Sequence, residues 1–279
     1  MPRTVAHFEL QAPLGHGTLG ELHRARDLDV GRTAAVRLIA PSIAENERTR
    51  LEVLQAAHAL AAIEHPSIAA VYACGDGPDG TFIASEFVPG QLLSALVHGT
   101  PLHPRRALDL AAQLADGLAA AQAHGLVHGA LSSASVIVTP KGTAKLLDVG
   151  LVPWTRAGGA APGDDVAGIG ALLFEMLAGR PYKPGWPGEL RVPELPNDVQ
   201  PVLQQLLAPR PGEAFDSMAT VAAVLRDVGL VVTARSTAPA TAPSPVADSQ
   251  GGSGRAMLVG LVVLLVLATL AWAFFRGMS

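Results

Sequence analysis

The chain has 279 residues, a formal net charge of −4 and one cysteine, Cys74. This length allows one large domain or two modest ones with a hydrophobic core. A single thiol can form neither an internal disulfide nor a metal cluster, which favours a reducing cytosolic setting. The mildly acidic composition, without a basic stripe along the sequence, argues against nucleic acid as a partner.

Residues 8–39 predict three antiparallel strands, because apolar and polar side chains roughly alternate there. The alternation is broken at the glycine loop LGHGTLG and at the turn DLDVGR. A helix is expected over 44–62, and two further strands over IAAVYACG and GTFIASEFV. The expected buried face of the helix holds Leu51, Leu54, Ala57 or His58, and Ala61.

The next part of the sequence predicts mainly helices. The first is expected to start at Pro104 and to end just before Gly125, and a short β-like stretch over 136–150 follows it. Asp164 and Asp165 are expected to cap a helix that is apolar on nearly every side and therefore central. Two shorter helices are predicted around VQPVLQQLLA and MATVAAVLRDV. A small β-rich part followed by a larger helical part indicates the α+β class.

Residues 256–275, AMLVGLVVLLVLATLAWAFF, carry no charged side chain and predict a transmembrane helix. As a helix this stretch spans roughly 30 Å, the thickness of the hydrocarbon core of a bilayer. A buried core helix is the alternative, and apolar character all round favours the membrane. Residues 231–255 predict a flexible Ala/Pro/Ser/Thr/Gly linker, and 276–279 a short tail. Residues 1–254, which comprise a globular domain over 1–230 and the linker, are expected in the cytoplasm, because the N-terminus carries no secretory signal.

Several motifs occur in a characteristic order over about residues 7–228. LGHGTLGEL places Gly15, Gly17 and Gly20 in a loop that continues as a hairpin, which disfavours a dinucleotide-binding turn. SEFVPGQLL, VHGALSSASVIV and DVG follow. This series resembles the bacterial, membrane-anchored Ser/Thr protein kinases of the Hanks type. The resemblance implies a bilobal fold in which the glycine loop covers the nucleotide phosphates.

The resemblance places Ser85 at the gatekeeper position, with Glu86 to Val88 as the hinge whose backbone would bind adenine. Arg37, in AAVRL, stands where the family has the lysine that contacts the phosphates and pairs with a glutamate. Ala56 occupies that glutamate position, and Glu52 lies one turn earlier. Arg37 is expected either to contact phosphate or to be an exposed strand residue.

The catalytic loop shows the largest departures from the family. His128 is kept and is expected to pack in the interior, but Gly129 replaces the arginine and Ala130 the aspartate that accepts the substrate's proton. Ser132 stands for the lysine, and Ser135 for the asparagine that binds the metal. Alanine cannot accept a proton, and a serine hydroxyl is a poor ligand for Mg²⁺.

Downstream motifs are altered as well. Asp148 of DVG is interpreted either as a ligand for one Mg²⁺ ion or as an ordinary turn residue, and Asp165 aligns with the aspartate that opens the family's central helix. No APE motif is present, and Ala214 stands where the family has the arginine that pairs with the APE glutamate. A buried charge would be unfavourable without its partner, so both losses are expected together.

These departures predict a membrane-tethered pseudokinase, a scaffold or regulator that is not an enzyme and requires no cofactor. Two alternatives involve ATP and Mg²⁺: a weakly active kinase that uses Arg37 and Asp148, and a nucleotide sensor without phosphotransfer. The expected partners are proteins at the membrane, such as an active kinase or a phosphothreonine-reading domain. Thr155 and the linker hydroxyls are the candidate phosphate acceptors, with a plain surface loop as the other interpretation of Thr155.

Overall fold

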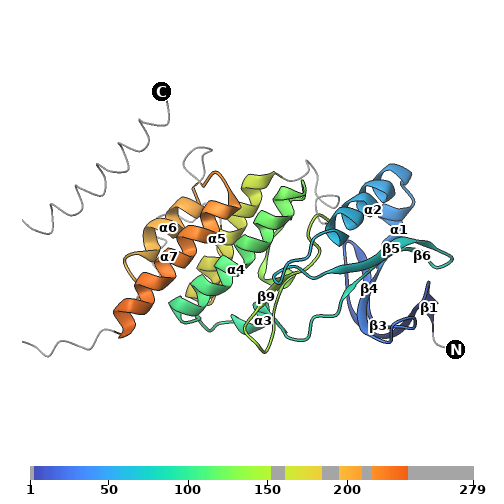
Figure 1. The fold of residues 1–279 in the computed structure, drawn as a ribbon, viewed down its shortest axis with the longest axis horizontal. Helices are drawn as coiled ribbons and strands as arrows, with labels where there is room; N and C mark the ends of the chain where they lie inside the picture. The colour runs from blue at the N-terminus through green and yellow to red at the C-terminus, as the bar shows by residue number, and fades with distance from the viewer. Residues whose placement is uncertain (1–2, 152–160, 184–194, 209–214, 238–279) are drawn as a thin grey trace, which may run out of the picture. The chain divides into compact units, whose positions relative to one another are not determined.

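The computed structural model describes residues 3–151, 161–183, 195–208 and 215–237 (Figure 1). The strands are β1 (Thr4–Val5), β2 (Phe8–Gly17), β3 (Gly20–Asp27), β4 (Thr33–Ile39), β5 (Val71–Gly77), β6 (Gly80–Glu86), β7 (Gln91–Leu92), β8 (Val136–Val138) and β9 (Ala144–Leu146). The helices are α1 (Pro41–Ala44), α2 (Glu47–Ala61), α3 (Leu93–Leu96), α4 (Pro104–Ala123), η1 (Ser133–Ser135), α5 (Pro162–Ala178), α6 (Val199–Leu206) and α7 (Met218–Thr237).

The N-terminal lobe, β1 to β6 with α1 and α2, is built on one antiparallel sheet in the order β1-β2-β3-β4-β6-β5. The three strands predicted over 8–39 and the two that follow are present, and β1 is an addition that pairs with β2. A small core around Phe8, Val36 and Phe82 fills one face of the sheet. Helix α2 lies along β5 (Figure 1), so the helix positions the sheet edge beside the second lobe.

Helix α2 buries only part of the predicted face. Leu54 and Ala57 are buried as expected, but Leu51 and Ala61 are exposed, and the buried stripe also includes Leu60. The helix is rich in alanine, so more than one apolar stripe fits its sequence. Contact with β5 selects among them, which is tertiary information that residue spacing does not contain.

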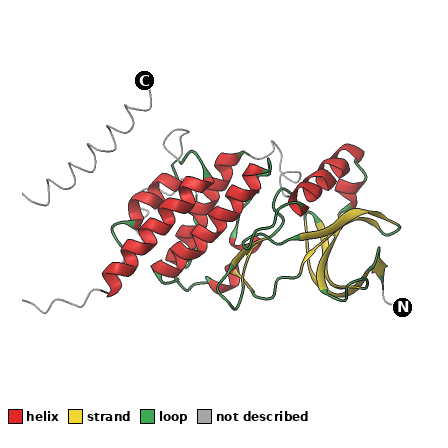
Figure 2. Ribbon diagram, in the orientation of Figure 1, coloured by secondary structure: helices red, strands yellow, loops and turns green. Residues whose placement is uncertain are grey.

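The C-terminal lobe, from β7 onward, is mainly helical (Figure 2). Its central element α4 begins at Pro104 and ends before Gly125, which has a positive φ of 73°, as predicted. Helices α5 and α7 both pack on α4, and α7 continues to Thr237, past residue 230. One hydrophobic cluster runs from α2 through α4 and α5 to α7, so both lobes share a core.

Helix α5 begins at Pro162, earlier than the pair of aspartates that we expected to cap it. Asp164 lies in the first turn and accepts a hydrogen bond from the backbone amide of Ala161 at 3.0 Å, so it does serve the helix start. Asp165 does not cap the helix. Its side chain is fully buried and faces the loop after α4 instead.

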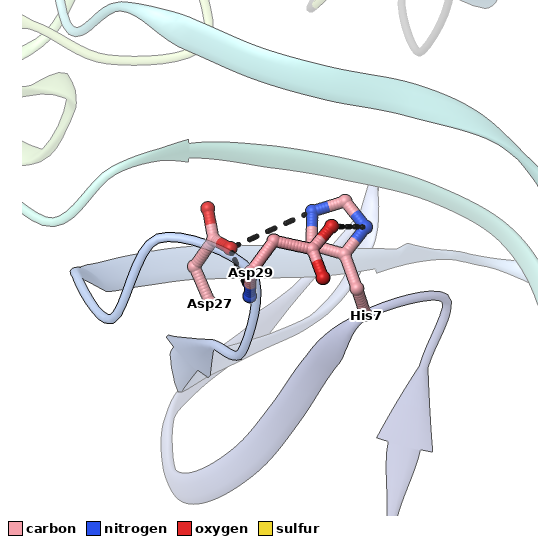
Figure 3. Close-up of side chains that lie close together, drawn as sticks. All are labelled: His7, Asp27 and Asp29. Atoms are coloured by element: carbon pink, nitrogen blue, oxygen red, sulfur yellow. Dashed lines mark hydrogen bonds and ion pairs between the residues drawn. The ribbon is translucent and has the colours of Figure 1, made fainter.

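The buried carboxylate of Asp27 closes the turn between β3 and β4 (Figure 3). One oxygen accepts from the amides of Asp29 and Val30, and the other accepts from Nε of Arg32 at 3.0 Å. The ring of His7 lies 3.7 Å from Asp27 on one side and 3.7 Å from Asp29 on the other. Although one histidine and two carboxylates can bind a metal, the donors of the turn already use both oxygens of Asp27. We therefore assign this cluster a structural role.

Among the helices that the structure describes, none has both the length and the apolar character needed to cross a bilayer. The predicted span over 256–275 and the linker before it from residue 238 lie outside the described residues, as do Thr155 and Ala214.

Replacing Gly20 with alanine should destabilise the N-terminal lobe. Gly20 has a φ of +119°, and a Cβ atom there would lie 1.9 Å from the carbonyl oxygen of Leu38. We expect Gly20→Ala to lower the free energy of unfolding by about 1–3 kcal/mol or more, measured by urea denaturation without nucleotide. Gly15→Ala is the matched control, because no atom lies within 4 Å of that Cβ position. Equal effects of the two substitutions would contradict this explanation.

Candidate functional site

A cavity of about 400 Å³ lies between the two lobes. Its walls are mostly apolar and come from strands β2 to β6 of the N-terminal lobe and from β8 and the turn after β9 in the C-terminal lobe. Cavities of this size and character hold small organic ligands, with a few polar groups that fix the orientation. The predicted site residues that line it are Arg37, the gatekeeper Ser85, the hinge residues Glu86 to Val88, and Asp148.

The glycine hairpin does not line the cavity itself. Leu14 and Leu22, on the two strands of the hairpin, do, while Gly17 pairs with Gly20 at the tip. Gly15 and Gly17 are exposed, and a Cβ at either position would meet no atom within 4 Å. The backbone of this hairpin is therefore open to the approach of a ligand group.

The hinge is held by an ion pair that the sequence analysis did not anticipate. Lys145, on β9, lies 2.7 Å from Oε2 of Glu86, and its Nζ also donates to the carbonyl of Ile68. The charge of Glu86 is thereby neutralised beside the cavity. The backbone amide of Val88 has no hydrogen-bond partner within the described part of the chain, so it can donate to a ligand.

Arg37 and Asp148 meet at the cavity wall. Nη2 of Arg37 donates to Oδ2 of Asp148 at 2.6 Å, and the two side chains are only 12% and 28% exposed. The interpretation of Arg37 as an exposed strand residue is therefore wrong. Asp148 has a φ of +55°, a conformation that costs energy for a residue with a side chain.

Helix α2 supplies no carboxylate to Arg37. The buried Ala56 occupies the position expected for the glutamate, and Glu52 instead pairs with Arg48 within the helix at 3.0 Å. Arg37 is thus directed toward Asp148 because the C-terminal lobe offers a partner that α2 lacks.

The carboxylate of Asp165 holds the loop after α4 by accepting hydrogen bonds from its backbone. Its two carboxylate oxygens accept the backbone amides of His128 at 3.0 Å and Gly129 at 2.7 Å. Burial raises the pKa of Asp165. The two amide donors act in the opposite direction, because they favour the charged carboxylate, but burial has the larger effect. The left-handed φ of Gly129, +71°, lets both amides point at the same carboxylate.

The ring of His128 is fully buried, and neither ring nitrogen has a hydrogen-bond partner among the described residues. Burial lowers the pKa of His128 and outweighs the opposing effect of the Asp165 carboxylate. A neutral imidazole without partners is a packing residue and not a group that is ready to exchange protons with a ligand.

The other loop residues do not reach the cavity. Ala130 is exposed, and Ser132 and Ser135 bond to each other. The hydroxyl of Ser135 donates to the carbonyl of Ser132 at 2.8 Å and accepts from its amide at 3.1 Å. Ala134 lines the cavity in their place, which the alignment of motifs did not indicate.

Acidification should destabilise the protein partly through His128. Because burial lowers its pKa, the unfolded chain takes up a proton at a higher pH than the folded chain does. This contribution to stability is present above about pH 6.5 and is lost as the pH falls below that value. We expect His128→Leu to reduce the fall in melting temperature between about pH 7.5 and about pH 5.5, measured by calorimetry. His65, whose pKa burial also lowers, is unchanged in the variant and leaves a residual slope. An identical pH dependence of the two proteins would refute the assignment.

Comparison with known proteins identifies relatives of the chain. The model of the protein tyrosine and serine/threonine kinase family matches residues 8–159. The chain is 31% identical over 204 residues to serine/threonine-protein kinase PknB of Mycolicibacterium smegmatis, and 30% identical over 169 residues to serine/threonine-protein kinase pkn2 of Myxococcus xanthus. These alignments cover 62% and 60% of this chain, but only 33% and 20% of the relatives. The chain thus spans a third or less of their length.

The fold is similar to that of the PknI kinase domain of Mycobacterium tuberculosis. The two structures superpose with a TM-score of 0.69 at 21% identity, over 81% of this chain and 98% of that domain. This likeness confirms the predicted bilobal arrangement of a β-sheet lobe and a helical lobe.

The expectation that the chain is not an enzyme is contradicted, because the relatives are named serine/threonine-protein kinases. The physical reason lies in phosphoryl transfer itself, which depends mainly on positioning and electrostatics, so the altered residues of the catalytic loop do not by themselves decide against activity. The predicted relationship to bacterial Ser/Thr kinases is confirmed. The family model covers more than half of the sequence, and the chain therefore belongs to the protein kinase family.

Proposed function

We propose that this chain is a divergent serine/threonine protein kinase of low activity that binds an adenine nucleotide between its lobes. The observation that carries the proposal is the interlobe cavity, in which Arg37, Asp148 and the hinge lie together. Membership of the kinase family supports the same conclusion. The apolar walls fit a planar base, and the amide of Val88 can donate to its edge.

The phosphate end of the nucleotide would lie toward Arg37. The guanidinium is fixed by Asp148 and retains N–H groups for phosphate oxygens, which it can bind in a bidentate manner. The exposed backbone at Gly15 and Gly17 is open on the same side of the lobe. The guanidinium and the glycine backbone would together hold the phosphates in place without a flexible lysine side chain.

In the proposed reaction, a hydroxyl oxygen of the substrate forms a bond to the terminal phosphorus while the bond to the bridging oxygen of the leaving diphosphate breaks. Ala130 stands at the position where the family has the proton acceptor, so the hydroxyl proton passes to water or to a phosphate oxygen. General-base catalysis contributes about 10²–10⁴-fold to a rate. We therefore propose a reaction that is slower by roughly this factor than in relatives that hold the aspartate.

Restoring the acceptor should raise the rate. We expect Ala130→Asp to increase phosphate incorporation by about 100-fold, followed as autophosphorylation by intact-protein mass spectrometry. Ala123→Asp is the matched control, because Ala123 is exposed and does not line the cavity. Asp148→Ala, which frees Arg37 from its partner, should abolish the reaction. Nucleotide binding without phosphate transfer in both the unmodified chain and Ala130→Asp would overturn the kinase proposal and leave a nucleotide sensor.

We also propose that residues 256–275 anchor the chain in the cell membrane and that residues 238–255, which follow α7, form the tether. The uncharged sequence of 256–275 supports this assignment. A tether raises the effective concentration of the domain for other membrane proteins, which would include an active kinase or a phosphothreonine-reading protein. Hydroxyl residues of the tether would be the sites that such a kinase modifies.

Removal of the predicted span should release the protein from membranes. We expect the full chain in the membrane fraction and a variant without residues 256–279 in the soluble fraction, measured by immunoblotting after ultracentrifugation. A variant without residues 276–279 alone is the control and should stay with the membrane. A full chain that is soluble without detergent would disprove the anchor.

A further inference from the structure

The charges around the cavity nearly cancel. Among the described residues that line it, Arg37 has the one cationic side chain, and Glu86 and Asp148 have the acidic ones. Glu86 is neutralised by Lys145 at 2.7 Å, and Asp148 by Arg37 at 2.6 Å. Asp148 is therefore the single lining carboxylate that could serve a metal ion, and a guanidinium already contacts it.

The residues present do not fit the Mg²⁺ ion that the kinase family implies. Magnesium requires oxygen ligands in near-octahedral geometry, usually with one or two carboxylates. Oδ2 of Asp148 is bonded to Arg37, whose positive charge would lie beside the ion. Ser135, at the position of the second ligand, uses its hydroxyl as both donor and acceptor with the backbone of Ser132. The hydroxyl that would have to coordinate the metal is thus already engaged in hydrogen bonds within its own turn.

The orientation of Arg37 is built into the fold. In the register of the sheet it lies between Leu22 on β3 and Ile83 on β6, and both of these neighbours line the cavity. On the helix side, Ala56 offers no carboxylate. The guanidinium is thus held at the cavity wall by the sheet on two sides and by Asp148 at its tip.

We infer that the cavity binds its nucleotide without a divalent cation, and that Arg37 supplies the positive charge that a metal ion supplies elsewhere in the family. This inference rests on the proposed nucleotide site and specifies which group of that site binds the phosphates of the nucleotide. A guanidinium has five N–H donors in one plane, so one edge can remain on Asp148 while other donors bind phosphate oxygens. The ligand class is a nucleoside diphosphate or triphosphate in its metal-free form.

Arginine and lysine differ in this arrangement. A lysine ammonium is a single point charge, which cannot present two edges to a carboxylate and a phosphate at once. Arg37→Lys should therefore weaken metal-free binding while it keeps the charge. Combining it with Ser135→Asn, which restores an amide ligand, should make binding stronger in magnesium than in EDTA.

The test is isothermal titration calorimetry of the detergent-solubilised full chain with ADP, in excess EDTA and in millimolar magnesium chloride. For the unmodified protein we expect a dissociation constant that is not lowered by magnesium. Arg37→Gln should raise the dissociation constant in EDTA by about tenfold or more, as charge-assisted hydrogen bonds are lost. Arg48→Gln is the matched control in the same lobe, because Arg48 is exposed and pairs only within α2. If Arg37→Gln does not fold, Arg37→Lys provides the same comparison.

The outcomes separate the two proposals. Binding that is at least tenfold tighter with magnesium would overturn the metal-free site and leave the nucleotide-binding function intact. Equal weakening by Arg37→Gln and Arg48→Gln would also overturn it, since the effect would not depend on the cavity. The absence of binding in both buffers would overturn the proposed function together with the inference.

Discussion

The ion pair between Arg37 and Asp148 links the two lobes at the cavity wall and fixes where the guanidinium lies. It joins β4 of the sheet to the turn after β9, across 111 residues of sequence. Ion pairs that are mostly buried lose much of their Coulombic gain to desolvation, so the pair adds little to stability on balance. Its importance is positional. The unusual backbone at Asp148, with φ of +55°, is maintained because the carboxylate must reach the guanidinium.

A second carboxylate explains why the loop keeps its shape although its side chains differ from those of the family. Asp165 binds backbone amides at His128 and Gly129, and those contacts do not depend on which side chain follows at residue 130. The loop can therefore change its chemistry without losing its conformation. Fold and reaction are specified by separate sets of atoms in this region, so similarity of fold alone does not establish the rate of catalysis.

Periodicity and end signals predicted most elements, because these are local properties of the chain. Helix α4 illustrates this, with Pro104 at its start and Gly125 beyond its end. The buried face of α2 was predicted only in part. Leu54 and Ala57 are buried as their spacing indicates, but alanine leaves several stripes nearly equivalent until contact with β5 selects one. The pairing of Arg37 with Asp148 and that of Lys145 with Glu86 were missed for a related reason. A charged residue in a strand indicates that it needs a partner, but the partner is set by contacts between distant segments.

The arginine at position 37, where the family has lysine, has to be considered together with Ala56, which stands where the family has the glutamate on α2. In a kinase site, a lysine held by that glutamate leaves the aspartate of the DFG turn available for a metal. Here Ala56 cannot hold a cation, so Arg37 reaches across the cavity and takes the aspartate as its partner. A metal ion at Oδ2 of Asp148 would compete with the guanidinium for that oxygen, whereas a phosphate can join the same guanidinium from its free edge. The metal-free recognition that we propose would leave this interlobe contact in place while the ligand is bound.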